Sequence, residues 1–251
     1  MRVVSLHPDV LVATSACWAV TCTVVRGGEE GFVIDSPVLP EELEVLPSIL
    51  AQAEFPFSGL LATHGDWDHL LGRLAFPNAA LGVAETTAAR LTGAPGEAQR
   101  ELRDFDEQWY VRRPKPLSLG QVQALPVPGT IELGDGHELQ CWPTDGHTVD
   151  GMALWADWAG VLVVGDYLSP VEIPMVRDRD AYVATLERLR DLVEQADWIV
   201  PGHGEVLDSA RAMAILREDL TYLSDLATLP LARRTGEQRK LHAENLERLG
   251  S

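Results

Sequence analysis

The hydrophobic positions at the start of the chain come in short runs that are typical of β-strands. Four such runs are VVSL, VLVAT, WAVTCTVV and GFVID, and turn residues such as His7-Pro8-Asp9 and Gly27-Gly28 separate them. Leu, Ile and Ala then recur at helical spacing over residues 41–53, directly after Pro40, and a buried strand is expected over 59–63. The pattern therefore predicts a strand meander, a helix and a further strand.

The rest of the chain alternates between helical and strand patterns. After a short helix near Leu70, residues 84–109 favour helix with Gly and Pro interruptions, and WYVRRPKPLSLGQ has no clear period. We expect an inserted loop or lid around residues 90–120. Further strands are expected over 122–125, 138–142, 152–155, 161–164 and 198–200, and helices over 180–194, 208–226 and 237–249.

This order of elements is typical of an α/β (α+β) protein in which two sheets pack face to face under helices. No internal repeat, low-complexity tract or linker marks a domain boundary. We therefore predict a single domain over residues 1–251, with C-terminal helices within residues 206–251.

The composition of the chain limits the kinds of molecule that we expect it to bind. The 251 residues are 46% hydrophobic and 23% charged, and 38 acidic against 20 basic residues give a formal net charge of -18. Such a field repels phosphate backbones, so we expect no nucleic-acid partner. Most of these charges are expected on a solvated surface, although they also favour divalent cations slightly.

The sequence shows little sign of a targeting segment or of a disulfide framework. The three cysteines form no C-x-x-C pair, and the N-terminal region has neither a basic segment nor a continuous apolar core typical of a signal peptide. No apolar run approaches the roughly 20 residues that span a bilayer. We expect a cytoplasmic protein that does not bind membranes, and we leave open whether it forms a homo-oligomer.

One polar cluster stands out after the strand expected at 59–63. The stretch Thr63-His64-Gly65-Asp66-Trp67-Asp68-His69 contains two histidines and two aspartates within six residues. A solvated turn is the alternative interpretation, because loops collect Asp and Gly. Two histidines that bracket two aspartates are, however, a poor turn sequence and a good source of imidazole and carboxylate ligands for metal ions.

Three further motifs occupy the same kind of position. Asp145-Gly146-His147-Thr148, Gly165-Asp166 and Pro201-Gly202-His203-Gly204 each follow an expected strand. Loops from several strand ends can converge in layered folds, so ligands distant in sequence can meet there.

Taken together and in order, these motifs resemble those of the metallo-β-lactamase superfamily, with its H-x-H-x-D-H loop, a later His, an Asp after a Gly and a final G-H. The resemblance spans residues 64–203. It implies a four-layer αββα sandwich with two metal ions at one edge of the sheets, and a supporting role without metal ligation for Asp35. It also implies a ligand set: His64, Asp66 and His147 for the first ion, Asp68, His69 and His203 for the second, and Asp166 between them.

Asp66 departs from the family pattern, which has a second His there. A carboxylate is a harder ligand, so zinc is the metal we expect first, while iron or manganese stay open. The flavo-diiron branch of the family has a carboxylate at this position, which makes a di-iron oxidoreductase-like protein the alternative function. The chain has no residues left for the flavodoxin-like domain of that branch, so we rank it second.

The expected chemistry is hydrolysis. A metal-bridging hydroxide is the expected nucleophile, since two cations lower the pKa of bound water. Asp68 is the expected catalytic residue, orienting that hydroxide and accepting its proton. The substrate would be a small molecule with an ester, thioester, amide, lactone or phosphodiester bond. A binding protein that has lost turnover is a third alternative, against which the presence of Asp68 argues.

Other residues are candidates for substrate contacts. Arg112 and Arg113, with Lys115, could capture an anionic substrate, although ordinary surface solvation is the explanation that we favour. Tyr167 and Ser169 could donate hydrogen bonds to a developing oxyanion if they face the cleft. His242 lies on the last expected helix, where it is either a substrate ligand or an ordinary surface residue.

Overall fold

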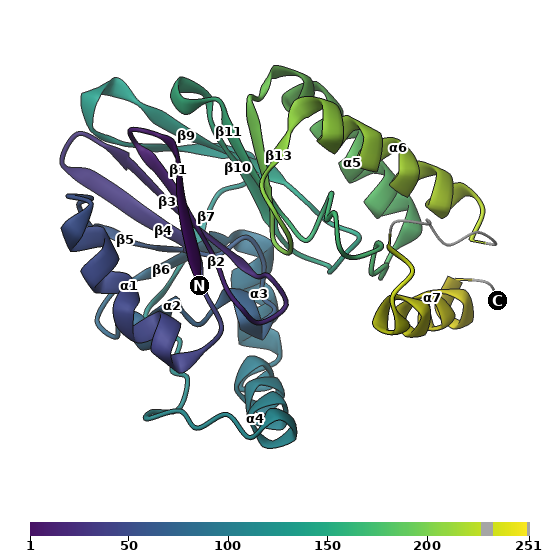
Figure 1. Ribbon diagram of the computed structural model, residues 1–251, viewed down its shortest axis with the longest axis horizontal. Coiled ribbons are helices and arrows are strands. Elements are labelled where there is room, and N and C mark those ends of the chain that lie inside the picture. The colour runs from purple at the N-terminus through teal and green to yellow at the C-terminus, as the bar shows by residue number, and fades with distance from the viewer. Residues whose placement is uncertain (227–232, 250–251) are drawn as a thin grey trace.

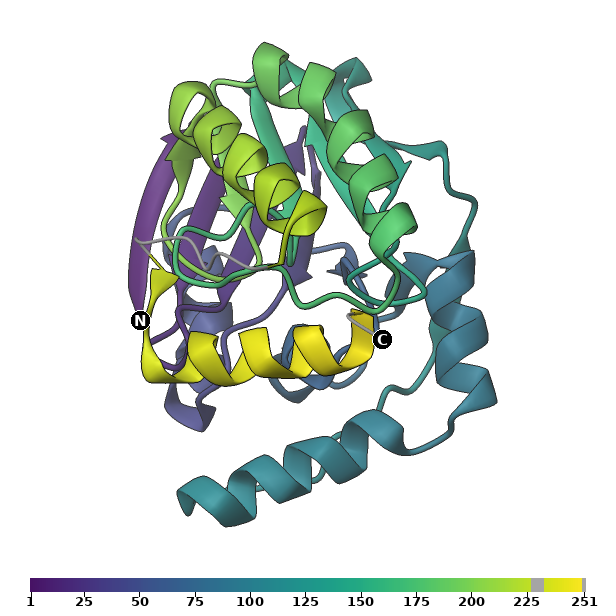
Figure 2. The same cartoon turned by 90° about the vertical axis from the view of Figure 1, so that its right-hand side faces the viewer.

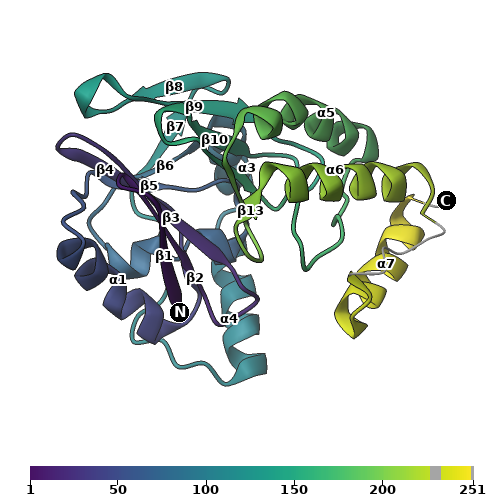
Figure 3. The ribbon, with the colours of Figure 1, turned by 45° about the horizontal axis from the view of Figure 1, so that its top comes forward.

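Two β-sheets form the centre of the protein (Figure 1). The structure is a computed structural model that describes residues 1–226 and 233–249. Helices cover the outer face of each sheet, as Figure 3 shows with α1 (Pro40–Gln52) on one side and α5 (Arg179–Gln195) and α6 (Ser209–Ser224) on the other. This arrangement of two mixed sheets between helices confirms the predicted fold class.

The first sheet has seven strands that lie side by side in the order of the sequence. They are β1 (Arg2–His7), β2 (Val10–Thr14), β3 (Thr21–Gly27), β4 (Glu30–Asp35), β5 (Gly59–Leu61), β6 (Leu81–Ala84) and β7 (Val122–Leu125). Strands β1 to β4 pair antiparallel, which confirms the predicted meander, and β4 to β7 pair in parallel. Parallel neighbours need crossover connections, and helices supply them.

The crossover elements determine which side chains reach the sheet edge. Helix α1 links β4 to β5, the 3₁₀ turn η1 (Trp67–His69) and α2 (Gly72–Ala75) link β5 to β6, and α3 (Glu85–Gly93) and α4 (Glu97–Trp109) link β6 to β7. Helix α1 begins at Pro40, where a missing N–H costs nothing, and buries Leu43, Leu46 and Leu50 at helical spacing against the sheet.

The second sheet has six strands in the order β13-β12-β11-β10-β9-β8. Their bounds are β8 (Gly129–Glu132), β9 (Glu138–Pro143), β10 (Met152–Ala156), β11 (Val161–Gly165), β12 (Trp198–Pro201) and β13 (Leu207–Asp208), with 3₁₀ turns η2 (Gly134–Gly136) and η3 (Asp157–Ala159). All neighbours pair antiparallel except β11 and β12, which are parallel and joined through α5. The last helix, α7 (Gly236–Leu249), lies beyond α6.

Three apolar clusters hold the layers together. One lies between the sheets and includes Ile34 and Leu61 of the first sheet and Leu154 and Val163 of the second. The other two pack the outer faces of the sheets against α1 and α4 and against α5 and α6. Buried apolar side chains therefore fix how the two sheets face each other, and with them the relative positions of the strand ends.

The main differences from the sequence-based expectations concern short elements. Strands β6, β8 and β13, which have two to four residues each, were not predicted. The region around 90–120 is largely helical, and Figure 2 shows α4, drawn in teal, projecting away from the sheets, while α7, in yellow, crosses below α6. Among the helices that the structure describes, none is long and apolar enough to cross a membrane.

Candidate metal centre

Four strand ends carry the candidate ligands to one edge of the two sheets. His64 follows β5 of the first sheet, whereas His147, Asp166 and His203 follow β9, β11 and β12 of the second. The strands of both sheets end at this edge, and the chain turns there into loops whose side chains point toward one another. The convergence is therefore a consequence of packing the sheets face to face.

The structure brings all seven predicted ligands together. In three groups, side-chain atoms able to bind a metal lie within 4.8 Å of one another. The groups are His64 with Asp66 and His147, Asp68 with His69 and His203, and His64 with His69 and Asp166. The first two match the two sets that the family resemblance implied, which we call the first subsite and the second subsite.

Asp166 lies between the two subsites. Its Oδ1 is 3.2 Å from His69 Nε2, and its Oδ2 is 3.2 Å from His147 Nε2 and 3.4 Å from His203 Nε2. The fourth imidazole, that of His64, has its Nε2 3.7 Å from the same Oδ2. One carboxylate therefore faces histidines of both subsites, as a bridging ligand would have to.

Several of these buried atoms have no hydrogen-bond partner. They are Nε2 of His64, His69 and His147 and Oδ1 of Asp166. Leaving a buried polar atom unsatisfied costs about 1–3 kcal/mol, so a fold that gathers four of them at one point is expected to bind something there. Imidazole nitrogens and carboxylate oxygens are ligands for divalent transition-metal ions. The residues present therefore fit a metal site.

The opposite ring nitrogen is hydrogen-bonded in three of the four histidines. His64 Nδ1 lies 3.1 Å from Thr63 Oγ1, His147 Nδ1 lies 3.2 Å from the carbonyl oxygen of Met175, and His203 Nδ1 lies 3.1 Å from that of Trp18. A carbonyl oxygen can only accept, so Nδ1 of His147 and His203 donates, and in the neutral ring Nε2 keeps its lone pair for a cation.

Asp35 supports the loop of the first sheet, the role that the family resemblance implied. Its carboxylate accepts hydrogen bonds from Thr63 N (2.8 Å) and Thr63 Oγ1 (2.9 Å), and its Oδ2 lies 3.1 Å from His69 Nδ1. Thr63 Oγ1 gives its proton to Asp35, which leaves a lone pair to accept from His64 Nδ1. A single buried carboxylate at the end of β4 thus orients one histidine of each subsite.

The charges of the cluster shift its pKa values in opposite directions. Burial opposes the charged forms, but the surrounding imidazoles outweigh it and hold the pKa values of Asp66 and Asp166 well below their usual range. Burial likewise acts against the charged form of His147, yet hydrogen bonds to Asp166 and Asp66 raise its pKa to about 10. A metal ion would therefore displace protons from this cluster when it binds.

Asp66 has a partner that the sequence did not reveal. Its Oδ2 faces His64 (3.6 Å) and His147 (3.7 Å), while Oδ1 pairs with Arg90 Nη2 at 2.8 Å. Arg90 of α3 also donates to Asp150, whose other oxygen accepts from Gly65 N. The arginine thus balances the extra carboxylate that replaces a histidine in the family pattern. Nothing in the sequence near Arg90 signals this contact, because it depends on how α3 packs.

Tyr167 and Ser169, which were predicted to contact the substrate, make other contacts in the structure. The Tyr167 hydroxyl donates to the carbonyl of Asp145 (2.6 Å) and accepts from His147 N (3.1 Å), so its only proton is used within the turn that carries His147. Ser169 Oγ donates to the carbonyl of His203. Both side chains are buried and support ligand loops, and in this structure neither donates to an oxyanion in the cleft.

The basic residues that were predicted to contact the substrate bind other groups or lie away from the metal centre. Arg113 Nε pairs with Asp106 at 2.9 Å and its Nη1 donates to Val38 O, so the guanidinium joins α4 to the start of α1. Arg112 is exposed and contacts no candidate ligand in the described part of the chain. His242 Nδ1 lies 3.1 Å from the Tyr222 hydroxyl, where it joins α7 to α6. The structure therefore does not bring these three residues to the metal centre.

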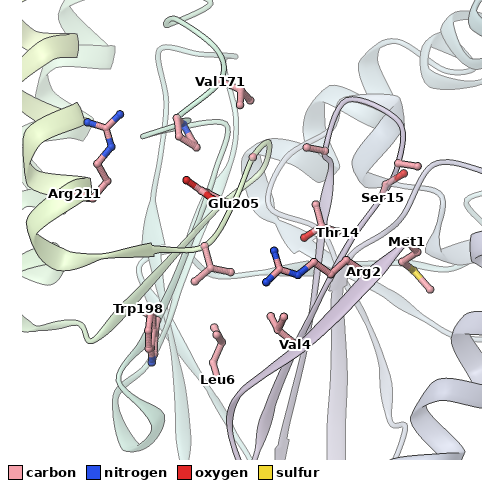
Figure 4. Close-up of a pocket in the computed structure, with 15 residues that line it drawn as sticks. Met1, Arg2, Val4, Leu6, Thr14, Ser15, Val171, Trp198, Glu205 and Arg211 are labelled. Atoms are coloured by element: carbon pink, nitrogen blue, oxygen red, sulfur yellow. The ribbon is translucent and has the colours of Figure 1, made fainter. Parts of the chain in front are cut away.

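A separate groove of about 920 Å³ lies between the edge strand β1 and the loops around β13 (Figure 4). Val4, Leu6 and Trp198 line it, and Arg2 and Arg211 lie on opposite sides. None of the seven candidate ligands lines this groove. A backbone hydrogen bond from Gly204 N to Ala19 O connects its two walls next to His203 and separates it from the metal centre.

Comparison with known proteins agrees with this geometry. The sequence profile of the metallo-beta-lactamase superfamily matches residues 16–203, which include every candidate ligand. The chain belongs to this superfamily. Among curated superfamily relatives, a beta-lactamase-like protein 2 homolog from Caenorhabditis elegans is 27% identical over 183 residues, which is 72% of this chain and 54% of that protein. The chain thus spans about half the length of that relative.

Solved structures of the superfamily share the fold. A metallo-beta-lactamase from Pontibacter korlensis superimposes with a TM-score of 0.65 at 19% identity, covering 89% of this chain and 99% of that one. A metallo-beta-lactamase family protein from Thermus thermophilus gives 0.68 at 20% identity, covering 98% and 95%. At this level of identity the likeness shows the metallo-beta-lactamase fold alone.

Proposed function

We propose that this chain is a dinuclear metal-dependent hydrolase that cleaves an ester, thioester, lactone or phosphodiester bond in a small molecule. Membership of a superfamily of metallo-hydrolases supports the general class. The observation that carries the proposal is the convergence of four imidazoles and three carboxylates, with Asp166 facing histidines of both subsites and buried Nε2 atoms that have no partner.

Each part of the cluster has a role in this proposal. His64, Asp66 and His147 would hold one ion, Asp68, His69 and His203 the other, and Asp166 would contact both. When bound, two divalent cations lower the pKa of water toward neutrality and polarise a substrate oxygen. Asp68 would orient the attacking water and take its proton.

The surroundings of Asp68 suit a proton acceptor. Its Oδ2 lies 3.4 Å from His203 Nε2 and 3.8 Å from His69 Nε2. Burial acts to raise the pKa of Asp68, but the charge of His69 and the contact with His203 outweigh it, so the pKa lies below its usual value. The carboxylate is therefore ionised at neutral pH, as a base must be.

Zinc is the metal that we propose, and Asp66 is the observation that favours an alternative. It places a carboxylate in the first subsite, and carboxylates suit iron and manganese better than imidazoles do. A di-iron oxidoreductase-like function, with a separate electron donor, is therefore the second candidate.

Two measurements test the proposal. Elemental analysis of protein purified without added metal should find about two zinc ions per chain, in line with two ligand sets. The metal-loaded protein should then hydrolyse at least one member of a panel of esters, thioesters, lactones and phosphodiesters. Iron in both subsites together with reductant-dependent oxygen consumption would favour the second candidate instead, and absence of hydrolysis across the panel would overturn the hydrolase proposal.

A further inference from the structure

Three aromatic side chains form a wall beside the ligand loop. Trp18, in the loop between β2 and β3, has its ring centre 5.8 Å from that of Trp67 and 5.0 Å from that of Phe105. Trp67 and Phe105 lie 4.8 Å apart. Because Trp67 stands between Asp66 and Asp68 in the sequence, this aromatic wall adjoins ligands of both subsites.

The wall is open to solvent at Trp18. That residue is 40% exposed, although its carbonyl oxygen is fixed by the hydrogen bond from His203. Water also reaches the ligands on this side, because the side chain of Asp66 is 22% exposed, against 9% for that of Asp68. Solvent therefore reaches both a ligand of the first subsite and one member of the aromatic wall.

Helix α4 places carboxylates along the same approach. Glu97, Glu101 and Phe105 follow one another at intervals of four residues, so they form a stripe along one side of the helix. Phe105 contacts Trp67, and Glu97 lies 3.9 Å from Arg90, the arginine that holds Asp66. Glu101 therefore lies between the aromatic wall and Asp66. Among the described residues it makes no hydrogen bond or ion pair.

A second carboxylate lies near Trp18. Glu172 Oε1 is 3.7 Å from His203 Nδ1, the atom that also bonds to the Trp18 carbonyl, and the Glu172 side chain is 34% exposed.

The positive charges nearby are already balanced. Arg90 is bound by Asp66 and Asp150, and Arg113 by Asp106. Neither of these arginines therefore neutralises Glu101 or Glu172, which leaves two carboxylates near the aromatic wall.

We propose that the substrate carries a cationic group, an amine or a quaternary ammonium, held against the exposed part of Trp18 and balanced by Glu101 and Glu172. The inference rests on the proposed hydrolytic function, and it names the class of substrate that this site would take. A cation over an aromatic face beside carboxylates is a recognised way to bind ammonium groups. It replaces the expectation, drawn from Arg112 and Arg113, of an anionic substrate.

A pair of substrates with equal shape tests the charge directly. Acetylthiocholine is compared with its neutral isostere, in which a tert-butyl group replaces the trimethylammonium, by thiol release. We expect kcat/KM to be roughly tenfold higher for the cation, the size expected of a cation–aromatic contact with charge support. The preference should fall as ionic strength rises, since screening weakens charge attraction at an open site.

Binding without turnover gives a second readout. Choline and the matching neutral alcohol are each titrated into the protein as purified, and tryptophan fluorescence reports their binding. The metal content of the same sample is measured. Choline should bind roughly tenfold more tightly. Glu101→Gln and Trp18→Leu should each reduce the preference in both assays. Glu107→Gln is the control, because it makes the same change on the side of α4 opposite Phe105, and it should leave the preference for the cation unchanged.

The outcomes separate this inference from the proposed function. Hydrolysis of both thioesters with equal or reversed preference would overturn the cationic site and leave the hydrolase standing. In a third outcome, neither thioester is hydrolysed, but choline still binds more tightly than the neutral alcohol and Glu101→Gln removes that preference. This result would support the cationic site and count against thioester hydrolysis. Equal binding of choline and its neutral isostere would overturn the site.

Discussion

The two metal subsites differ in the groups that hold their ligands in place. In the second subsite, Asp35 at the end of β4 contacts His69 directly, and the Trp18 carbonyl, in the loop between β2 and β3, accepts from His203. In the first subsite Asp35 reaches only His64, through Thr63. The other two ligands rely on peripheral groups, since Arg90 of α3 holds Asp66 and the Met175 carbonyl of the loop before α5 holds His147.

This contrast has an energetic consequence. Ligands supported by a packed sheet keep their positions without a metal, whereas ligands supported by a helix in an insertion and by a loop depend on fewer contacts. We therefore expect the second subsite to bind its ion more tightly and the first subsite to be the one whose metal preference changes with substitution. The following predictions test that difference.

Asp68→Ala should have the largest effect. It removes the proposed proton acceptor together with a ligand of the second subsite, so kcat should fall roughly 10³-fold while far-UV circular dichroism stays unchanged. Asp66→Ala serves as the comparison and should reduce kcat less, with loss of metal from the first subsite. Equal losses in the two variants would contradict both the proposed role of Asp68 and the contrast between subsites.

Arg90→Met should destabilise the protein by about 3 kcal/mol, because it leaves the carboxylates of Asp66 and buried Asp150 without a counter-charge. Urea unfolding measures the stability, and elemental analysis should show loss of about one metal ion per chain. Arg103→Met, an exposed arginine on the neighbouring helix α4, is the control and should change stability by less than about 0.5 kcal/mol. Retention of both ions in Arg90→Met would refute the dependence of the first subsite on this arginine.

Asn245→Ala should weaken the first subsite from a distance. Buried Asn245 of α7 donates to Pro174 O and Tyr222 Oη and accepts from Val176 N, which holds the loop whose Met175 carbonyl orients His147. Losing these hydrogen bonds should cost about 2 kcal/mol in thermal or urea unfolding. Chelator competition should release the first ion faster than in the parent protein, with the second ion unaffected. Equal release of both ions would show that α7 does not act on one subsite alone.

Asp66→His should have the smallest effect, a roughly tenfold shift of the zinc-to-manganese ratio bound from an equimolar mixture. The imidazole restores the family pattern, but it also leaves Arg90 without one of its partners. Measuring the metal content of each subsite after stepwise chelation would locate the shift. An unchanged ratio would mean that the carboxylate of Asp66 does not set the metal preference.

The sequence by itself determined the candidate ligands, through the order of the motifs that resemble the superfamily, and most of the scaffold. The strand runs around β1 to β5, β7 and β9 to β12 and the helical spacing of α1, α5, α6 and α7 could be predicted from apolar runs and their periods. His64, Asp66, Asp68 and His69 are close together in the sequence, and His147, Asp166 and His203 follow strands. Strand-end placement and local chemistry were therefore sufficient to predict that these residues would meet.

Only the tertiary structure decided what surrounds those ligands. Arg90, Met175 and Trp18 reach the metal centre through the packing of α3 and of loops that carry no motif, and their contacts join residues far apart in the sequence. The same packing directed Arg113 to Asp106 and the Tyr167 hydroxyl to Asp145. Residue type sets which chemistry a side chain can perform, whereas the neighbours available after folding decide which of its polar atoms remain free to perform it.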